Sequence, residues 1–103
     1  MHKIRQSMPK VLVYITAKIT WIFLFWGTDL NENRAHVHVG KKGTEELCKI
    51  WLEPTVSIEK EGSLTTKQQV HVLEIAIFHR EELLRQWKHF KNGQKIRLIT
   101  IKK

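Results

Sequence analysis

Two histidines separated by one residue are the side chains of this sequence best suited to chemistry. His36 and His38 alternate with Val37 and Val39 within residues 35–40, and a glycine ends the pattern. A period of two is typical of a β-strand, so we expect both imidazoles on one solvent-accessible face and both valines on the other. Each imidazole titrates near neutral pH and has two distinct nitrogens. A neighbouring pair can therefore divide acid and base roles or bind a metal ion.

The first hypothesis is metal-independent cleavage of RNA, with His36 and His38 as the catalytic residues. Attack of a ribose 2′-hydroxyl on the adjacent phosphate needs a base, an acid and cations near the developing charge. Arg34, Lys41 and Lys42 lie at the two ends of the same predicted strand, and we expect them to contact the phosphate. This chemistry requires no cofactor.

Three other interpretations of the pair stay open. In one interpretation the protein is a non-catalytic binding module, whose basic C-terminal helix and tail bind nucleic acid or an acidic protein partner. Alternatively, the His-x-His pair binds a metal ion, which needs at least one more ligand, and the nearby candidates are Asp29, Glu45 and Glu46. In the last interpretation both histidines are ordinary surface residues of a strand.

Positive charge is concentrated at the two ends of the chain. The formal net charge is +8, and residues 85–103 carry seven cations and no acid, whereas residues 28–59 carry four cations and six acids. Such asymmetry favours a polyanionic partner, although a basic face also serves solubility. The candidate nucleic-acid-binding residues are Arg34, Lys41, Lys42, Arg85, Lys88, Lys95 and Arg97.

Length and composition predict a single domain in a reducing compartment. With 103 residues, the chain suits one domain, and Cys48 is its only cysteine. An intrachain disulfide is therefore excluded, which fits a cytoplasmic location. Residues 11–26 are apolar but are interrupted by Lys18 and two threonines, so we expect neither a signal peptide nor a membrane span.

The order of the sequence patterns predicts an α+β fold with the strands first. Strands are expected over residues 11–15, 19–26, 35–40 and 47–53, with a short fifth one over 55–59, which gives a small antiparallel sheet of four to five strands. Both faces of residues 19–26 are apolar, so that strand should be central.

Two C-terminal helices are expected to pack on one face of this sheet. Thr65 or Thr66 caps the first helix. Arg80 lies in the middle of the apolar stripe, which predicts that the helix kinks or restarts near residues 79–81. Trp87 is expected to be buried against residues 21–25, and the histidines at 71, 79 and 89 are expected on the surface. The stripe itself comprises Val70, Leu73, Ala76, Ile77, Leu83, Leu84, Trp87 and Phe90.

The predicted boundaries are an N-terminal extension over residues 1–7, a single α+β domain over 8–92, and a basic tail or added strand over 93–103. Residue 8 is a second methionine, and Asn92-Gly93 is a helix stop.

Five short segments together resemble the small prokaryotic domain-of-unknown-function family 4160. They are Met8-Pro9-Lys10-Val11, Phe25-Trp26, His36-Val37-His38-Val39, Trp51-Leu52-Glu53-Pro54, and Glu82-Leu83-Leu84 with Trp87 and Phe90. The resemblance covers residues 8–92. It implies a toxin component of a toxin–antitoxin module, with a small antitoxin-like protein encoded nearby as its partner. The chain departs from the family pattern at Arg34, near which a proline is usual, and in its longer first hairpin.

Overall fold

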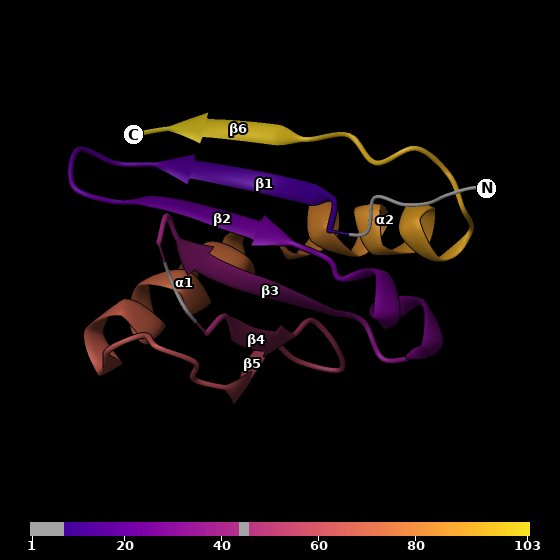
Figure 1. The fold of residues 1–103 in the computed structure, drawn as a ribbon, viewed down its shortest axis with the longest axis horizontal. Coiled ribbons are helices and arrows are strands. Elements are labelled where there is room, and N and C mark those ends of the chain that lie inside the picture. Colours follow the sequence, from indigo (N-terminus) through magenta and orange to yellow (C-terminus); the bar gives the residue numbers. More distant parts are fainter. Residues whose placement is uncertain (1–7, 44–45) are drawn as a thin grey trace.

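A six-stranded sheet and two α-helices form the fold of residues 8–43 and 46–103, the part of the chain that this computed structural model describes (Figure 1). The predicted α+β class is confirmed, whereas the predicted extension over residues 1–7 lies outside the described residues. The elements are β1 (Lys10–Ile15), β2 (Thr20–Leu24), a 3₁₀ turn η1 (Gly27–Asn31), β3 (His36–Lys41), β4 (Cys48–Trp51), β5 (Ser57–Lys60), α1 (Thr66–Phe78), α2 (Arg80–Lys91) and β6 (Ile99–Lys102).

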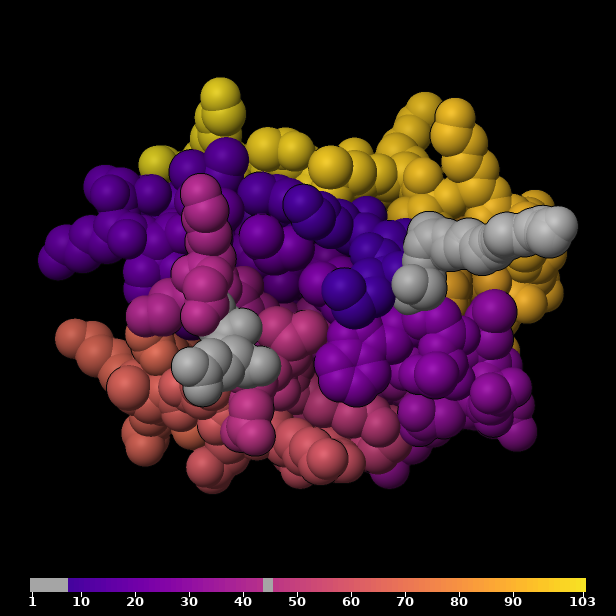
Figure 2. All heavy atoms as spheres, viewed as in Figure 1, coloured from indigo at the N-terminus to yellow at the C-terminus, as the bar shows by residue number. Residues whose placement is uncertain are grey.

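The sheet has the strand order β5-β4-β3-β2-β1-β6. The first five strands are antiparallel neighbours, and β2 lies between β1 and β3 as predicted. The prediction of four to five antiparallel strands followed by helices was one strand short, because β6 returns after α2 and pairs parallel with β1. In the space-filling view, this C-terminal segment (yellow) runs along the N-terminal strand (indigo) (Figure 2). The added strand covers backbone groups of β1 that an open sheet edge would expose.

Strand register assigns the side chains to two faces of the sheet. Phe23 lies opposite Val39, whereas Leu24 lies opposite His38. Both helices pack on the Phe23 face: the indole Nε1 of Trp21 donates to Nδ1 of His71 in α1, and the ring of Phe25 contacts Trp87 in α2. The histidine side chains of β3 therefore point to the opposite face.

The packing of Trp87 confirms the sequence prediction. Its side chain is 5% exposed, and its ring centroid lies 5.4 Å from that of Phe25. Phe90, one turn further along α2, also contacts Phe25, with centroids 5.0 Å apart, and its ring lies 6.0 Å from that of Trp87. This aromatic cluster joins α2 to the chain that leaves β2.

The helical segment breaks where its charge pattern predicted. Thr65 caps α1 and accepts a hydrogen bond from the N–H of Gln68, and α1 ends one residue before His79 while α2 begins one residue after it. Arg80 turns away from the stripe, and its Nε donates to the carbonyl of Leu52 at 2.7 Å. Neither of these helices, the only α-helices among the described residues, is long and apolar enough to cross a membrane.

The apolar stripe was only partly right over α1. Ala76 is buried and Leu73 packs against the core, as predicted. Val70 and Ile77 are instead 53% and 55% exposed, and Val72 and Ile75, which the stripe left out, are buried. The predicted stripe ran through both helices with one phase, but the restart at residue 79 gives each helix its own orientation toward the sheet.

The three histidines of the helices were also expected on the surface. All three are half-buried. His71 accepts the Trp21 hydrogen bond, and the ring of His79 contacts Tyr14 of β1. Burial lowers the pKa of His79, and the charge of Lys103 lowers it further.

Candidate functional site

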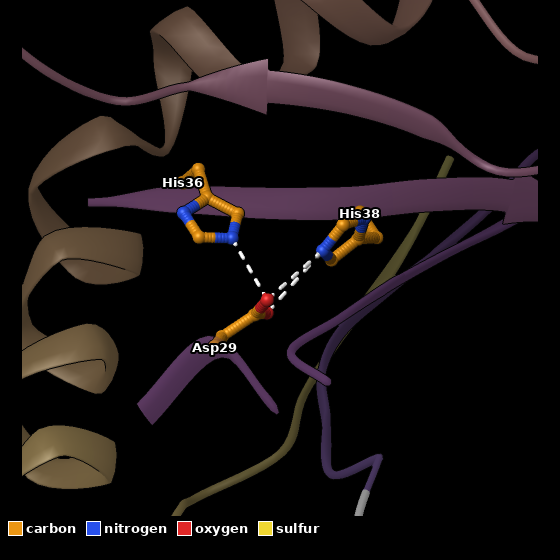
Figure 3. A group of neighbouring side chains, drawn as sticks. All are labelled: Asp29, His36 and His38. Carbon is orange, nitrogen blue, oxygen red and sulfur yellow. Dashed lines mark hydrogen bonds and ion pairs between the residues drawn. The ribbon is translucent and has the colours of Figure 1, made fainter. Parts of the chain in front are cut away.

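Three buried side chains meet at the start of β3, on the face of that strand that also carries Leu24's neighbour His38, and beside α2 (Figure 3). Asp29 comes from η1, and His36 and His38 come from β3. The Nε2 atom of His36 lies 3.0 Å from Oδ1 of Asp29, and Nε2 of His38 lies 3.3 Å from Oδ2. We call these three residues the acid–histidine cluster.

The expected solvent exposure of the histidines is wrong. The strand alternation places them side by side as predicted, with ring centroids 5.2 Å apart, but His36 is 0% and His38 4% exposed. The reason is that the loop after β2 folds back over β3. The ring of Trp26 stacks on His38, with centroids 4.0 Å apart and planes 10° apart, while the carboxylate of Asp29 covers both imidazoles.

Local hydrogen bonds fix the position of Asp29. Its Oδ2 accepts from the backbone N–H of Trp26 at 2.7 Å, which closes the 3₁₀ turn around the carboxylate. From α2, Nζ of Lys91 donates to the carbonyls of Leu30 and Glu32. The turn that carries Asp29 is therefore held by its own backbone and by a helix sixty residues further along the chain.

Aromatic rings hold His36 in place. The ring of Trp87 lies 4.9 Å from it, centroid to centroid, and that of Trp51 lies 5.5 Å from it. These rings shield the cluster from water and so strengthen its electrostatic interactions.

The tautomer of His36 follows from its second nitrogen. Nδ1 lies 2.9 Å from the carbonyl oxygen of Arg34, and because a carbonyl only accepts, Nδ1 must carry a hydrogen. In the neutral ring, Nε2 then presents a lone pair. This nitrogen is buried without a hydrogen-bond partner among the described residues, although Oδ1 of Asp29 is 3.0 Å away.

Asp29 is ionised in this environment. Burial by itself raises the pKa of the carboxyl group, but the imidazoles of His36 and His38, when they carry a proton on Nε2, and the N–H of Trp26 lower it more, so the pKa lies well below the usual range. A buried anion thus faces two imidazole nitrogens, and an isolated buried charge is costly unless a cation or hydrogen-bond donors compensate it.

The spacing of these atoms fits a metal ion. Each of the three residues offers one ligand atom, and the three atoms lie within 4.8 Å of one another. With bonds of about 2.0–2.1 Å, ligand atoms at right or tetrahedral angles lie roughly 2.8–3.4 Å apart. The single oxygen Oδ1 of Asp29 lies 3.0 Å from Nε2 of His36 and 3.4 Å from Nε2 of His38, so both of its contacts are at this spacing.

Of the three third-ligand candidates named from the sequence, Asp29 is the one in the cluster. Glu46 is exposed and absent from it, and Glu45 lies outside the described residues. Glu32 approaches instead, with Oε2 3.8 Å from Nε2 of His36, but its other oxygen pairs with Nζ of Lys49 at 3.3 Å.

A cavity of about 190 Å³ adjoins the cluster. The buried Asp29 and His38 line it together with the more exposed Trp26, Glu59 and Lys60. The cluster is therefore closed by protein on the side of Trp87 and borders open space on the side of His38.

The predicted phosphate-binding residues at the two ends of β3 do not lie next to His36 and His38. Arg34 lies over the ring of Trp51, 4.0 Å from its centroid, and its Nε donates to the carbonyl of Glu53. Lys41 and Lys42 are exposed at the far end of β3. By contrast, one groove beside α2 is lined by Arg85, Lys95 and Arg97. Lys88 is exposed but does not line this groove.

The residues that support the cluster were not identified from the sequence. Asp29 was named only as one of three candidate ligands, although its place in a short turn directly after Phe25-Trp26 was a usable signal. Trp87 was assigned to the core without its contact to His36, and Lys91 was not singled out. Both act over long sequence separations, which no local pattern encodes.

Comparison with known proteins identifies the family. A family model described as "Domain of unknown function (DUF4160)" matches residues 20–88, a segment that contains the whole acid–histidine cluster and Trp87 but ends before Lys91 and β6. No curated protein and no solved structure matches the chain. Because the match covers more than half of the 103 residues, the protein belongs to the DUF4160 family of domains of unknown function.

Proposed function

We propose that Asp29, His36 and His38 bind a divalent transition-metal ion and that this centre is the functional site of the protein. The observation that carries the proposal is the buried Nε2 of His36, which has no hydrogen-bond partner among the described residues and yet faces an ionised carboxylate. Two imidazole nitrogens and one carboxylate are a ligand set that suits zinc, iron(II) and neighbouring metals.

A bound cation satisfies these groups better than a proton on His36 does. A hydrogen on Nε2 would have no acceptor in line, and a buried unsatisfied donor costs about 1–3 kcal/mol. A metal ion contacts both nitrogens and the carboxylate at once. The hydrogen bond from Nδ1 of His36 to the Arg34 carbonyl is also the outer contact that metal-binding histidines usually make, because it directs the Nε2 lone pair to the ion.

The ligand number supports a catalytic rather than a purely structural metal. Structural zinc sites use four protein ligands, whereas catalytic sites use three and keep one position open. Here three protein ligands border a cavity. When bound in such a site, a divalent ion polarises a substrate oxygen or activates water for hydrolysis.

The same geometry favours the metal hypothesis over metal-independent cleavage. An acid and a base that act on one phosphate must stand on either side of it. In this structure the Nε2 atoms of His36 and His38 both lie within 3.4 Å of the Asp29 carboxylate, so the carboxylate occupies the space between them. RNA as the substrate stays a prediction.

Metal content tests the proposal. Protein purified without an affinity tag and dialysed against zinc should hold about one ion per chain by mass spectrometry, because the three ligands act together. Asp29→Asn, His36→Gln and His38→Gln should each lower this content at least tenfold. Glu46→Gln and His89→Gln are matched controls outside the cluster and should retain the metal. A parent protein that takes up no zinc, nickel, manganese or iron(II) would contradict the proposal.

A toxin role rests on the family resemblance, and the metal centre gives it a chemical test. Expression of the parent protein should inhibit bacterial growth, and Asp29→Asn should relieve the inhibition while its circular dichroism stays like that of the parent. An Asp29→Asn protein that is folded, lacks metal and remains fully inhibitory would separate toxicity from the metal site.

A further inference from the structure

A second polar site lies on the other side of α2 from the acid–histidine cluster. The helix and the segment that leads to β6 enclose a groove of about 760 Å³. Arg85 and His89 line it from the helix, and Lys95, Arg97 and Leu98 line it from the segment. We call this site the α2 groove.

The charges of the α2 groove are mostly of one sign. Glu82 is the acidic residue in its lining, and this carboxylate already pairs with Arg85 and accepts from the amide of Gln86. Among the described residues, neither the ammonium of Lys95 nor the guanidinium of Arg97 has an ion-pair or hydrogen-bond partner. The groove thus holds two cations without an ion-pair partner, Lys95 and Arg97, beside Arg85, which pairs with Glu82.

Gln86 fixes the segment that carries these cations. Its side chain is buried, its Oε1 accepts from the backbone N–H of Arg97 at 3.0 Å, and its Nε2 donates to Glu82 at 3.1 Å. The backbone at Arg97 is therefore tied to α2, and the groove is formed before any ligand arrives. A preformed site loses less conformational entropy when it binds.

The groove also has polar and apolar side chains besides its cations. His89 belongs to its lining, although Nδ1 of this ring is buried without a hydrogen-bond partner among the described residues, and Leu98 is 48% exposed. A ligand that suits these features combines spaced negative charges with hydrogen-bonding groups and flat apolar surface.

We propose that the α2 groove binds the backbone of single-stranded nucleic acid. A basic groove that follows the backbone is the usual way in which proteins bind single strands without reading sequence. Cationic contacts of this type release counterions, which makes the affinity strongly dependent on salt. The groove shares no lining residue with the acid–histidine cluster, so this proposal does not depend on a bound metal.

Binding of a fluorescein-labelled oligouridylate, measured by anisotropy at several salt concentrations, tests the proposal. The variant Arg85→Gln/Lys95→Gln/Arg97→Gln should bind at least tenfold more weakly at low salt. The slope of log K against log salt should fall by about 2, since each lost phosphate contact on a single strand removes about 0.7 from it.

The matched control is Lys18→Gln/Lys41→Gln/Lys42→Gln, which removes the same charge from exposed positions between β1 and β2 and at the end of β3, at the opposite end of the sheet (Figure 1). We expect it to weaken binding by less than threefold. Equal losses in the two triple variants would overturn the proposal in favour of general charge attraction. An unaffected groove variant, or tighter binding of polyglutamate than of the oligonucleotide, would also overturn it.

Discussion

The acid–histidine cluster and the α2 groove both contain a buried imidazole nitrogen without a hydrogen-bond partner among the described residues, but their surroundings are opposite. His36 faces an ionised carboxylate inside the protein, whereas His89 lines an open groove with three cations. A compact buried set of nitrogens with one anion suits a small cation. Cations spread along an open groove suit an extended anion. The chemistry of each site is therefore set by its neighbours and not by the histidine itself.

One helix supports both sites. Trp87 and Lys91, one turn apart on α2, contact His36 and the turn that carries Asp29. Arg85 and His89, also one turn apart, line the groove. Residues four positions apart lie on the same side of a helix, so α2 presents one side to each site.

Loss of Trp87 should have the largest effect, because it removes the packing on which both sites depend. Trp87→Ala should lower the free energy of unfolding by about 3–5 kcal/mol, as for other large buried aromatic residues. Phe78→Ala removes an aromatic side chain that is 81% exposed and should change stability by less than about 0.5 kcal/mol. Coinciding urea midpoints for Trp87→Ala and the parent would show that α2 does not anchor the fold.

Loss of Lys91 should affect one site much more than the other. Lys91→Ala frees the carbonyls of Leu30 and Glu32 and so loosens the turn that carries Asp29. Metal affinity, measured by competition with a chromophoric chelator, should fall about tenfold, the lower end of the range for outer contacts of metal ligands. Lys88→Ala removes the same charge from an exposed position of α2 and should leave the affinity unchanged. Similar losses in both variants would mean that charge, and not the fixed turn, is responsible.

Removal of the metal should leave the groove intact. Oligonucleotide affinity measured before and after dialysis against a chelator should agree within twofold, because no lining residue is shared and α2 is held by the aromatic core as well as by Lys91. A change of tenfold or more would reveal coupling of about 1.4 kcal/mol between the sites through α2.

Cys48 provides the smallest expected effect. It is buried in β4, and burial, with a contribution from Glu61, raises its pKa to about 11. Metals bind the thiolate, and this thiol stays protonated at neutral pH. Cys48→Ala should therefore retain the full zinc content, and the native parent should not react with a thiol reagent at pH 8 until it is unfolded. Loss of zinc in this variant would indicate that Cys48 is a ligand and that the ion does not bind to the acid–histidine cluster.

Local patterns of the sequence predicted the parts of the site that lie on one element. The alternation at His36 and His38 gave their shared face, and Arg80 marked the break between the helices. The burial of the histidines could not be predicted in this way, because it depends on a turn that folds back from β2 and on a lysine at the end of α2. The α2 groove combines Arg85 with Lys95 and Arg97, which follow the turn after α2. The sequence does not show in which direction the chain leaves that turn, so it could not predict that these residues lie together. The weak alternation of residues 95–103 likewise left open whether they pair with β1.

X-ray absorption at the zinc edge of the zinc-loaded protein tests the central claim most directly. We expect a first shell of nitrogen and oxygen at about 2.0–2.1 Å, with the outer scattering of two imidazole rings, and we expect His38→Gln, which loses the metal, to give at most a tenth of the zinc signal at the same protein concentration. A shell that contains sulfur at about 2.3 Å, or one without imidazole scattering, would contradict the assignment of Asp29, His36 and His38 as the metal centre.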